Sequence, residues 1–205
     1  ARDRFDANFN AAASSDRLGA GRDRQEAAGD RSHSAADRES ASADRVTSAR
    51  ERAASSIDEL TGAHRRDAGL VELAREMARA KRTKTPFVLA FIDVDGLKAT
   101  NDSLGHYAGD QLLSGVVNTM RAHLRGYDLI VRFGGDEFLC GLLDLSMQMA
   151  TERFFLINAD LAASRNASIT AGLAELEPGD SLDSLTARAD AALRGQRRQR
   201  PPART

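Results

Sequence analysis

The chain has 205 residues, a formal net charge of -1 and one cysteine, and it contains no apolar run long enough to cross a membrane. These properties argue against a nucleic-acid-binding surface, a membrane partner, an intrachain disulfide and a zinc cluster. The first ten residues also lack the apolar core of a signal peptide. We therefore expect a soluble cytoplasmic protein in which Cys140 is a small buried strand residue.

The first 57 residues are rich in Ala, Ser, Arg and Asp, and Asp-Arg pairs recur at a seven-residue period from Asp16 to Arg45. Such a period is typical of a supercoiled helix. The predicted seam contains mostly small and polar residues, which bury little apolar area, so the arm is either a coiled coil or partly disordered. Between Val46 and Leu60 we favour a helix, because its apolar residues share one face. Pairing with a second copy or with a partner helix is its expected role.

Two helical segments are predicted on either side of a break at Thr61-Gly62. The second extends from His64 to Arg82, where apolar residues recur at helical spacing, and it stops before Pro86. An amphipathic helix of this kind is expected to pack one face on a core.

Phe87–Ile92 is a continuous apolar run, which is typical of a strand buried on both faces. It leads into Asp93 and Asp95, whose side chains leave a strand on the same side and so can face one site. Like charges this close favour a bound cation. The alternative is that both acids are solvated at the strand end or cap the following turn.

Two strand-like runs, Tyr127–Phe133 and Phe138–Leu143, flank the tetrapeptide Gly-Gly-Asp-Glu and are predicted to form a hairpin. The two glycines allow a tight turn and leave room for a phosphate, while the two acids project from its tip. If the hairpin lies beside Asp93, hard oxygen ligands meet there, as a Mg²⁺ ion shared with substrate phosphates requires. An ordinary hairpin with a charged tip is the alternative.

The segment Arg132–Phe138, RFGGDEF, resembles the signature of GGDEF domains, the diguanylate cyclases. Four further segments resemble the same family in order: DELTG from Asp58, Phe91–Leu113, Ala167–Leu176 and Ala189–Leu193. The resemblance implies an α+β, ferredoxin-like fold of the nucleotide-cyclase and polymerase-palm type, with a mostly antiparallel central sheet. The expected organisation is a helical heptad-repeat arm at residues 1–57, the GGDEF domain at 58–198 and a disordered tail at 199–205.

The resemblance also implies a set of site residues. Magnesium (or manganese) would be held by Asp93, the carbonyl of Val94, Asp136 and Glu137, and the last two would also be catalytic. Implied GTP-binding residues are Asn101 and Asp110 at the guanine edge, and Gly96, Leu97, Lys98, Arg132, Gly134, Gly135 and Arg197 near the phosphates. Arg125 and Asp128 fit the family's inhibitory RxxD motif, which binds cyclic di-GMP, although a surface ion pair is the alternative.

The implied function is that of a homodimeric diguanylate cyclase, which condenses two GTP molecules to cyclic di-GMP, releases pyrophosphate and is inhibited by its product. A regulatory partner would act on the N-terminal arm. The chain departs from the family at Gly96-Leu97, where an aromatic pair is usual, and at Arg194 and Arg197, where Tyr and Lys are usual. These departures leave an alternative: a catalytically weak or inactive GGDEF domain that acts as a receptor for cyclic di-GMP or GTP.

Overall fold

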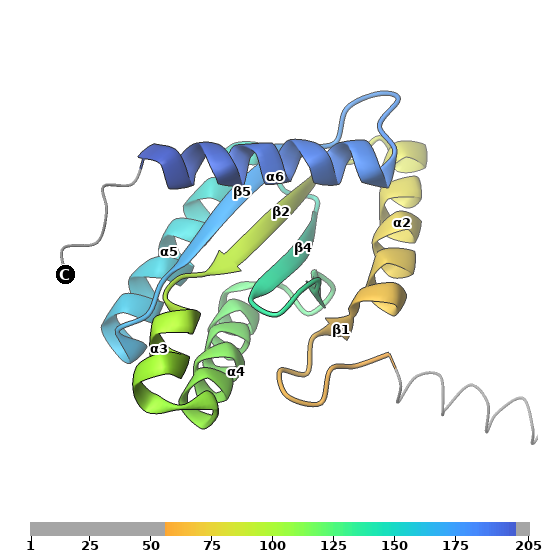
Figure 1. Cartoon of the computed structure of the whole chain (residues 1–205). Coiled ribbons are helices and arrows are strands. Elements are labelled where there is room, and N and C mark those ends of the chain that lie inside the picture. Colours follow the sequence, from red (N-terminus) through yellow and green to blue (C-terminus); the bar gives the residue numbers. More distant parts are fainter. Residues whose placement is uncertain (1–55, 200–205) are drawn as a thin grey trace, which may run out of the picture. The chain divides into compact units, whose positions relative to one another are not determined.

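The strand β2 (Phe87–Val94) lies inside a five-stranded sheet and is buried at every position. The computed structural model describes residues 56–199, and Figure 1 shows helices on both faces of the sheet. The other strands are β1 (His64–Arg65), β3 (Leu129–Arg132), β4 (Glu137–Leu143) and β5 (Ile169–Glu175). The helices are α2 (Arg66–Thr83), α3 (Leu97–Leu104), α4 (His106–His123), α5 (Met147–Arg165) and α6 (Leu182–Gln199).

The strand order is β1-β3-β4-β2-β5. The pair β3–β4 is an antiparallel hairpin, and β2 is antiparallel to both β4 and β5. Only the short β1 joins its neighbour, β3, in parallel among the described strands. The prediction of an α+β fold with a mostly antiparallel sheet is therefore confirmed.

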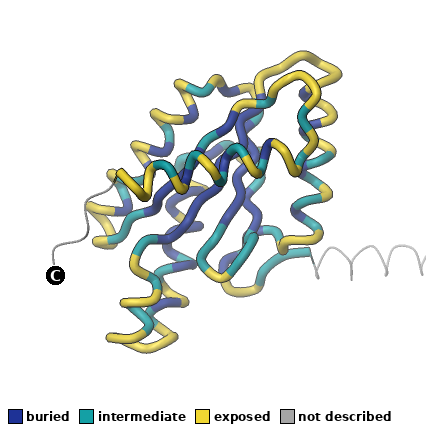
Figure 2. Tube along the Cα trace, turned by 45° about the horizontal axis from the view of Figure 1, so that its top comes forward, coloured by how far each residue is buried: buried dark blue, intermediate teal, exposed yellow. Residues whose placement is uncertain are grey.

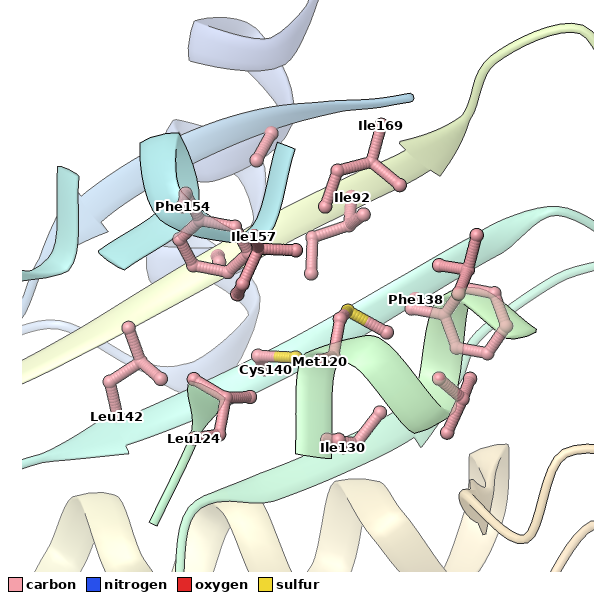
Figure 3. Close-up of a cluster of buried hydrophobic side chains, with 14 of the residues drawn as sticks. Ile92, Met120, Leu124, Ile130, Phe138, Cys140, Leu142, Phe154, Ile157 and Ile169 are labelled. Atoms are coloured by element: carbon pink, nitrogen blue, oxygen red, sulfur yellow. The ribbon is translucent and has the colours of Figure 1, made fainter. Parts of the chain in front are cut away.

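Both faces of β2 are covered, which explains its continuous apolar sequence. Ala90 and Ile92 belong to a core cluster with residues of α4 and α5, part of which Figure 3 shows around Cys140 and Phe138. Leu89 and Phe91 belong to the opposite cluster, which contains residues of α2 and α6. Cys140 is fully buried in β4, as predicted. Figure 2 shows the strands as the most buried part of the chain.

The predicted helices near the break at Thr61-Gly62 differ from the structure. Ile57 forms an isolated bridge with His64, and the residues between them form a turn rather than the end of a helix. Gly62 adopts a φ of 70° and donates its N–H to the carbonyl of Asp58, which closes this turn. His64 is part of β1, so α2 begins at Arg66 and not at His64. The remainder of the predicted arm lies outside the described residues.

The last helix begins earlier than the ADAAL motif indicates. Ser181 and Ser184 exchange hydrogen bonds between backbone N–H groups and side-chain hydroxyls, and this capping arrangement allows α6 to begin at Leu182. Gln199 belongs to the helix, whereas the predicted tail from 200 onward lies outside the described residues. Within residues 56–199, no helix is both long and apolar enough to span a bilayer.

Candidate active site

The turn between β3 and β4 lies against the end of β2. Glu137, the first residue of β4, is paired in register with Asp93, and the carbonyl of Asp136 accepts the N–H of Val94 at 3.0 Å. The N–H groups of Phe133 and Gly134 both donate to the Glu137 carbonyl. The structure therefore brings the two acids of the turn to the strand-end Asp93, over an interval of about forty residues of sequence.

The glycine at the first position of the turn leaves room for the Glu137 carboxylate. A Cβ atom on Gly134 would lie 2.8 Å from the carboxylate of Glu137, so a side chain there would push that carboxylate aside. Gly135 has open space around the position of its missing Cβ. The close approach of glutamate and backbone therefore depends on Gly134.

Asp93 is the most enclosed acid of this group, with 6% of its surface exposed. Burial raises the pKa of Asp93 above its ordinary value, Arg197 opposes this rise through a hydrogen bond and its charge, and Asp136 and Asp95 add to it by repulsion. The guanidinium of Arg197, near the end of α6, forms an ion pair with the Asp93 carboxylate. A cationic group thus already contacts the buried carboxylate.

Asp95 has a different environment from Asp93. Its carboxylate accepts hydrogen bonds from the hydroxyls of Ser168 at 2.7 Å and Thr170 at 2.8 Å, and its N–H donates to the Ser168 carbonyl. These contacts hold Asp95 against the start of β5. Asp95 therefore lies near Asp93, whose pKa its charge helps to raise, but hydrogen bonds to β5 occupy its carboxylate.

The donor set suits a divalent ion that is shared with a nucleotide. Among the described residues, no group of three or more His, Cys, Asp or Glu side chains forms a ready-made metal cage. Mg²⁺ is usually bound by one or two carboxylates together with substrate phosphates and water, so a complete protein cage is not needed. The ion pair on Asp93 shows that this carboxylate can hold a cation, and the register with Glu137 brings a second acid to the same end of β2. The residues present fit Mg²⁺ or Mn²⁺.

The N-terminus of α3 follows the strand-end acids directly. Gly96 is its N-cap with a φ of 78°, and no side chain caps the first N–H groups of this helix. Free N–H groups at a helix start favour an anion such as phosphate. Leu97 and Lys98 lie in the first turn, and Lys98 is exposed. This end of the helix therefore places phosphate-binding potential beside the acids.

Asn101 lies in α3 and contacts α4 at Gly109, the residue before Asp110. A Cβ on Gly109 would overlap the side-chain oxygen of Asn101, so that glycine lets the asparagine lie against α4. The Asn101 oxygen is buried and has no hydrogen-bond partner among the described residues. Buried polar atoms of this kind usually have a partner, and an N–H of a bound base would supply one. Asp110 is exposed.

Arg132 is engaged within the protein. One terminal nitrogen donates to both carboxylate oxygens of Asp58, at 3.0 and 3.2 Å, and the other donates to the Gly135 carbonyl at 3.0 Å. The structure thus gives Arg132 a connecting role between two turns. The role of Asp58 in this connection was missed in the sequence, although the DELTG motif that contains it was noted.

The turn that contains Asp58 is also held by α4. Ser114 donates its hydroxyl to the Leu60 carbonyl at 2.9 Å, and Arg121 donates to the Gly62 carbonyl. No local sequence signal identifies these two residues, because their partners lie more than fifty positions away.

Arg125 and Asp128 form a closed local network. The Asp128 carboxylate accepts the N–H of Arg125 at 2.8 Å and that of Leu143 at 3.3 Å. The Arg125 guanidinium donates to the hydroxyl of Tyr127 at 2.8 Å and to the Leu143 carbonyl at 3.3 Å. A cleft lined by Arg79, Tyr127 and Leu143, among others, adjoins this network. The network lies at the opposite end of β4 from the acidic turn.

Comparison with known proteins places these features in a family. Residues 55–201 match the family model described as "Diguanylate cyclase, GGDEF domain". The curated diguanylate cyclase DgcP of Pseudomonas aeruginosa is 35% identical over a 129-residue alignment that covers 59% of this chain and 19% of the relative. The chain therefore spans about a fifth of the length of that relative.

Solved structures show the same fold. The coiled coil and GGDEF domain of DgcB from Caulobacter crescentus, in complex with c-di-GMP, has a TM-score of 0.70 and 27% identity, covering 78% of this chain and 91% of that one. The diguanylate cyclase SiaD from Pseudomonas aeruginosa, in complex with its activator SiaC, has a TM-score of 0.68 and 28% identity, covering 96% of this chain and 79% of that one.

Proposed function

Because the chain belongs to the GGDEF family of diguanylate cyclases, we propose that it condenses two GTP molecules to cyclic di-GMP and releases two molecules of pyrophosphate. The observation that carries this proposal is the convergence of Asp93 with the Asp136–Glu137 turn, beside the uncapped start of α3. Acids and free N–H groups at one place match the needs of a metal-bound triphosphate.

Asp93, Asp136, Glu137 and the carbonyl of Val94 would hold Mg²⁺ or Mn²⁺. The bound ion would neutralise phosphate charge and favour loss of the proton from the attacking hydroxyl. Glu137, over Gly134 in the turn, is suited to accept that proton.

Substrate binding would use two parts of the α3–α4 region, one for the base and one for the phosphates. Asn101 and Asp110 would hydrogen-bond the guanine edge, where the Asn101 oxygen, which has no partner within residues 56–199, would accept a base N–H. The start of α3, from Gly96 to Lys98, would bind phosphate oxygens. Catalysis would then come mainly from positioning and charge neutralisation.

Each domain would bind one GTP, and two domains would face each other. The ribose 3′-hydroxyl of each nucleotide would attack the α-phosphate of the other, forming two phosphodiester bonds and displacing pyrophosphate at each. The enzyme would therefore act as a homodimer. Pairing of the N-terminal arms, or a regulatory partner bound to them, would set how often the domains meet.

The function is tested by incubating the full chain with GTP and Mg²⁺ and separating the products by chromatography. Cyclic di-GMP and pyrophosphate are expected from the wild type, and none above background from Asp136→Ala. The matched control is Asp67→Asn, an exposed acid in the first turn of α2, which is expected to retain activity. Failure of the dimeric wild type to form cyclic di-GMP would refute the proposal.

We propose that Arg125 and Asp128 bind the product. The adjoining cleft with Arg79, and the polar groups of Arg125, provide donors for guanine and phosphate oxygens. Binding would require Arg125 to leave Tyr127 or Leu143. A domain without turnover that acts as a cyclic di-GMP or GTP receptor is the second candidate, favoured by the atypical final helix with Arg194 and Arg197.

Calorimetry with cyclic di-GMP separates these possibilities. The wild type is expected to bind the product, and Arg125→Ala to bind it at least tenfold more weakly, because a charge-assisted forked contact is lost. If the chain is an active cyclase, the same variant is expected to lose product inhibition but to keep turnover. Binding of cyclic di-GMP or GTP without any turnover would favour the receptor function. Unchanged binding by Arg125→Ala would show that Arg125 does not bind cyclic di-GMP in either case.

A further inference from the structure

The final helix passes close to β5, and one residue makes this possible. A Cβ on Gly172 would overlap backbone atoms of Ala189 and Leu193, so α6 lies directly on the strand at this position. Gly172 is paired in register with Phe91 of β2. The position of Leu193 relative to the sheet is thereby set by backbone contact.

This contact determines which residue of α6 reaches Asp93. Phe91 belongs to the core cluster on the α6 side of the sheet, and Asp93 leaves β2 on the same side two residues later. One helical turn advances about 5.4 Å, close to the roughly 6.6 Å of two strand residues. Arg197, one turn after Leu193, therefore lies level with Asp93 along the strand direction.

The resulting ion pair has one buried and one accessible member. The Asp93 side chain is 8% exposed and the Arg197 side chain 47% exposed. The guanidinium thus reaches from solvent to an enclosed carboxylate that has Asp136 and Asp95 as like-charged neighbours. Arg194, three residues earlier in α6, pairs instead with Asp190 of the same helix. The two arginines of the same helix therefore have different partners.

We infer that Arg197 is an exchangeable counter-ion, which pairs with Asp93 in the nucleotide-free protein and moves to the triphosphate when metal and nucleotide enter together. This inference rests on the proposed function, because it uses the same metal and nucleotide. Arg remains charged at all accessible pH values, so near neutral pH the pair is broken by a cation that competes for Asp93 or by an anion that takes up the guanidinium. When a divalent ion binds alone, the displaced guanidinium gains no new hydrogen-bond partner. When a nucleotide binds with the ion, its phosphate oxygens accept hydrogen bonds from the guanidinium.

The consequence is a preferred order of binding. The divalent ion binds weakly to the free protein, and nucleotide and ion each raise the affinity for the other by the same factor. A lysine at this position, as in the family pattern, has a compact charge and lacks the planar fork that pairs well with a carboxylate. The competition with metal is therefore expected to be stronger with the arginine of this chain than with a lysine at position 197.

The experiment measures Mn²⁺ binding to the full chain without nucleotide, by the electron paramagnetic resonance signal of free Mn²⁺. Arg197→Gln is expected to bind Mn²⁺ roughly tenfold more tightly than the wild type, because a hydrogen-bonded charge no longer competes. Arg194→Gln, the matched control on the same helix, is expected to bind as the wild type does. Arg197→Lys is expected to lie between the wild type and Arg197→Gln.

The same titration is repeated with a GTP analogue that has a methylene bridge between the α- and β-phosphates and cannot be condensed. Arg197→Gln is expected to bind this analogue more weakly and to show a smaller mutual enhancement with Mn²⁺. Exchange predicts that Arg197→Gln raises the affinity for Mn²⁺ and lowers the affinity for the analogue. A purely structural role of Arg197 would lower both affinities.

Unchanged or weaker Mn²⁺ binding by Arg197→Gln, with a circular dichroism spectrum like that of the wild type, would overturn the inference. Equal tightening in Arg194→Gln would also overturn it, because the effect would then come from net charge alone. If Arg197→Gln fails to fold, the folded Arg197→Lys variant decides: binding identical to the wild type contradicts the exchange. Mn²⁺ binding needs no turnover, so this result stands apart from whether the chain makes cyclic di-GMP.

Discussion

Gly172 shows how a single residue can position a functional group at a distance. Its missing side chain lets α6 rest on β5, and the contact sets the height at which Arg197 meets Asp93. A glycine inside a strand usually weakens it, and close approach of another backbone is a common reason for its presence. At this position the closest atoms are backbone atoms, which cannot move aside as a flexible side chain can.

Gly172→Ala is therefore expected to lower the free energy of unfolding by about 1–3 kcal/mol, the usual cost of overpacking, or to displace α6. Gly195→Ala is the matched control, because it lies within α6 and has open space around its missing Cβ. That control is expected to stabilise the protein by up to about 1 kcal/mol through helix propensity. Urea unfolding followed by circular dichroism measures both, and equal stability of the two variants would contradict the packing argument.

The turn at Asp58–Ala63 is the element that connects the start of the described domain to the acidic site. Asp58 holds Arg132, and Arg132 in turn holds the carbonyl of Gly135 in the β3–β4 turn. Although burial opposes it, hydrogen bonds from Thr61 and Arg132 and the charge of Arg132 lower the pKa of Asp58 below its ordinary value. A movement of this turn would be transmitted through Arg132 to the β3–β4 turn that carries Asp136 and Glu137.

The lowered pKa of Asp58 predicts a pH-dependent contribution to stability. It is fully present above the unfolded-state value near 3.8 and is lost as the pH falls through the lower folded-state pKa. Asp58→Asn is thus expected to lower the free energy of unfolding by about 2 kcal/mol near neutral pH, with a difference that shrinks below that unfolded-state pKa. Urea titrations across the acid range measure this difference.

The control for that series is Glu59→Gln, since Glu59 is 92% exposed in its ion pair with Arg65. Exposed pairs contribute little, so no measurable change is expected. A difference for Asp58→Asn that stays constant down to the lowest pH would show that the carboxylate charge is not what stabilises the turn.

At the scale of the whole molecule, the proposed reaction needs two domains, because each would carry one nucleotide and one set of acids. Only a pair with two intact halves can form both phosphodiester bonds. A symmetric dimer of this type gives a characteristic response when intact and defective chains are mixed.

Wild type mixed with Asp136→Ala at equal amounts and constant total concentration is expected to retain about a quarter of the wild-type activity, because only dimers with two intact chains turn over. Activity should follow the square of the wild-type fraction. Cyclic di-GMP production, measured after the chains have exchanged, checks this relation. A linear dependence would show that each chain completes the reaction alone.

Local patterns in the sequence were sufficient for much of the fold. The apolar run before Asp93 predicted a doubly covered strand, and the glycine-containing link predicted the β3–β4 hairpin, because these features depend on neighbouring residues. The errors lie at element ends: Ile57 pairs with His64, and His64 pairs with β3, which helical periodicity cannot indicate. Tertiary pairing overrides weak local preference at such positions.

The sequence by itself determined the chemistry available to this protein: a buried strand that ends at Asp93, a glycine-containing hairpin with two acids at its tip, and the amides and arginines that accompany them. Only the tertiary structure decided the partners, Arg197 for Asp93 and Arg132 for Asp58. The physical reason is that periodicity and turn preference act between near neighbours, whereas the partner of a long charged side chain depends on which helix or turn packs beside it. In this protein that packing depends on contacts such as the one between Gly172 and α6.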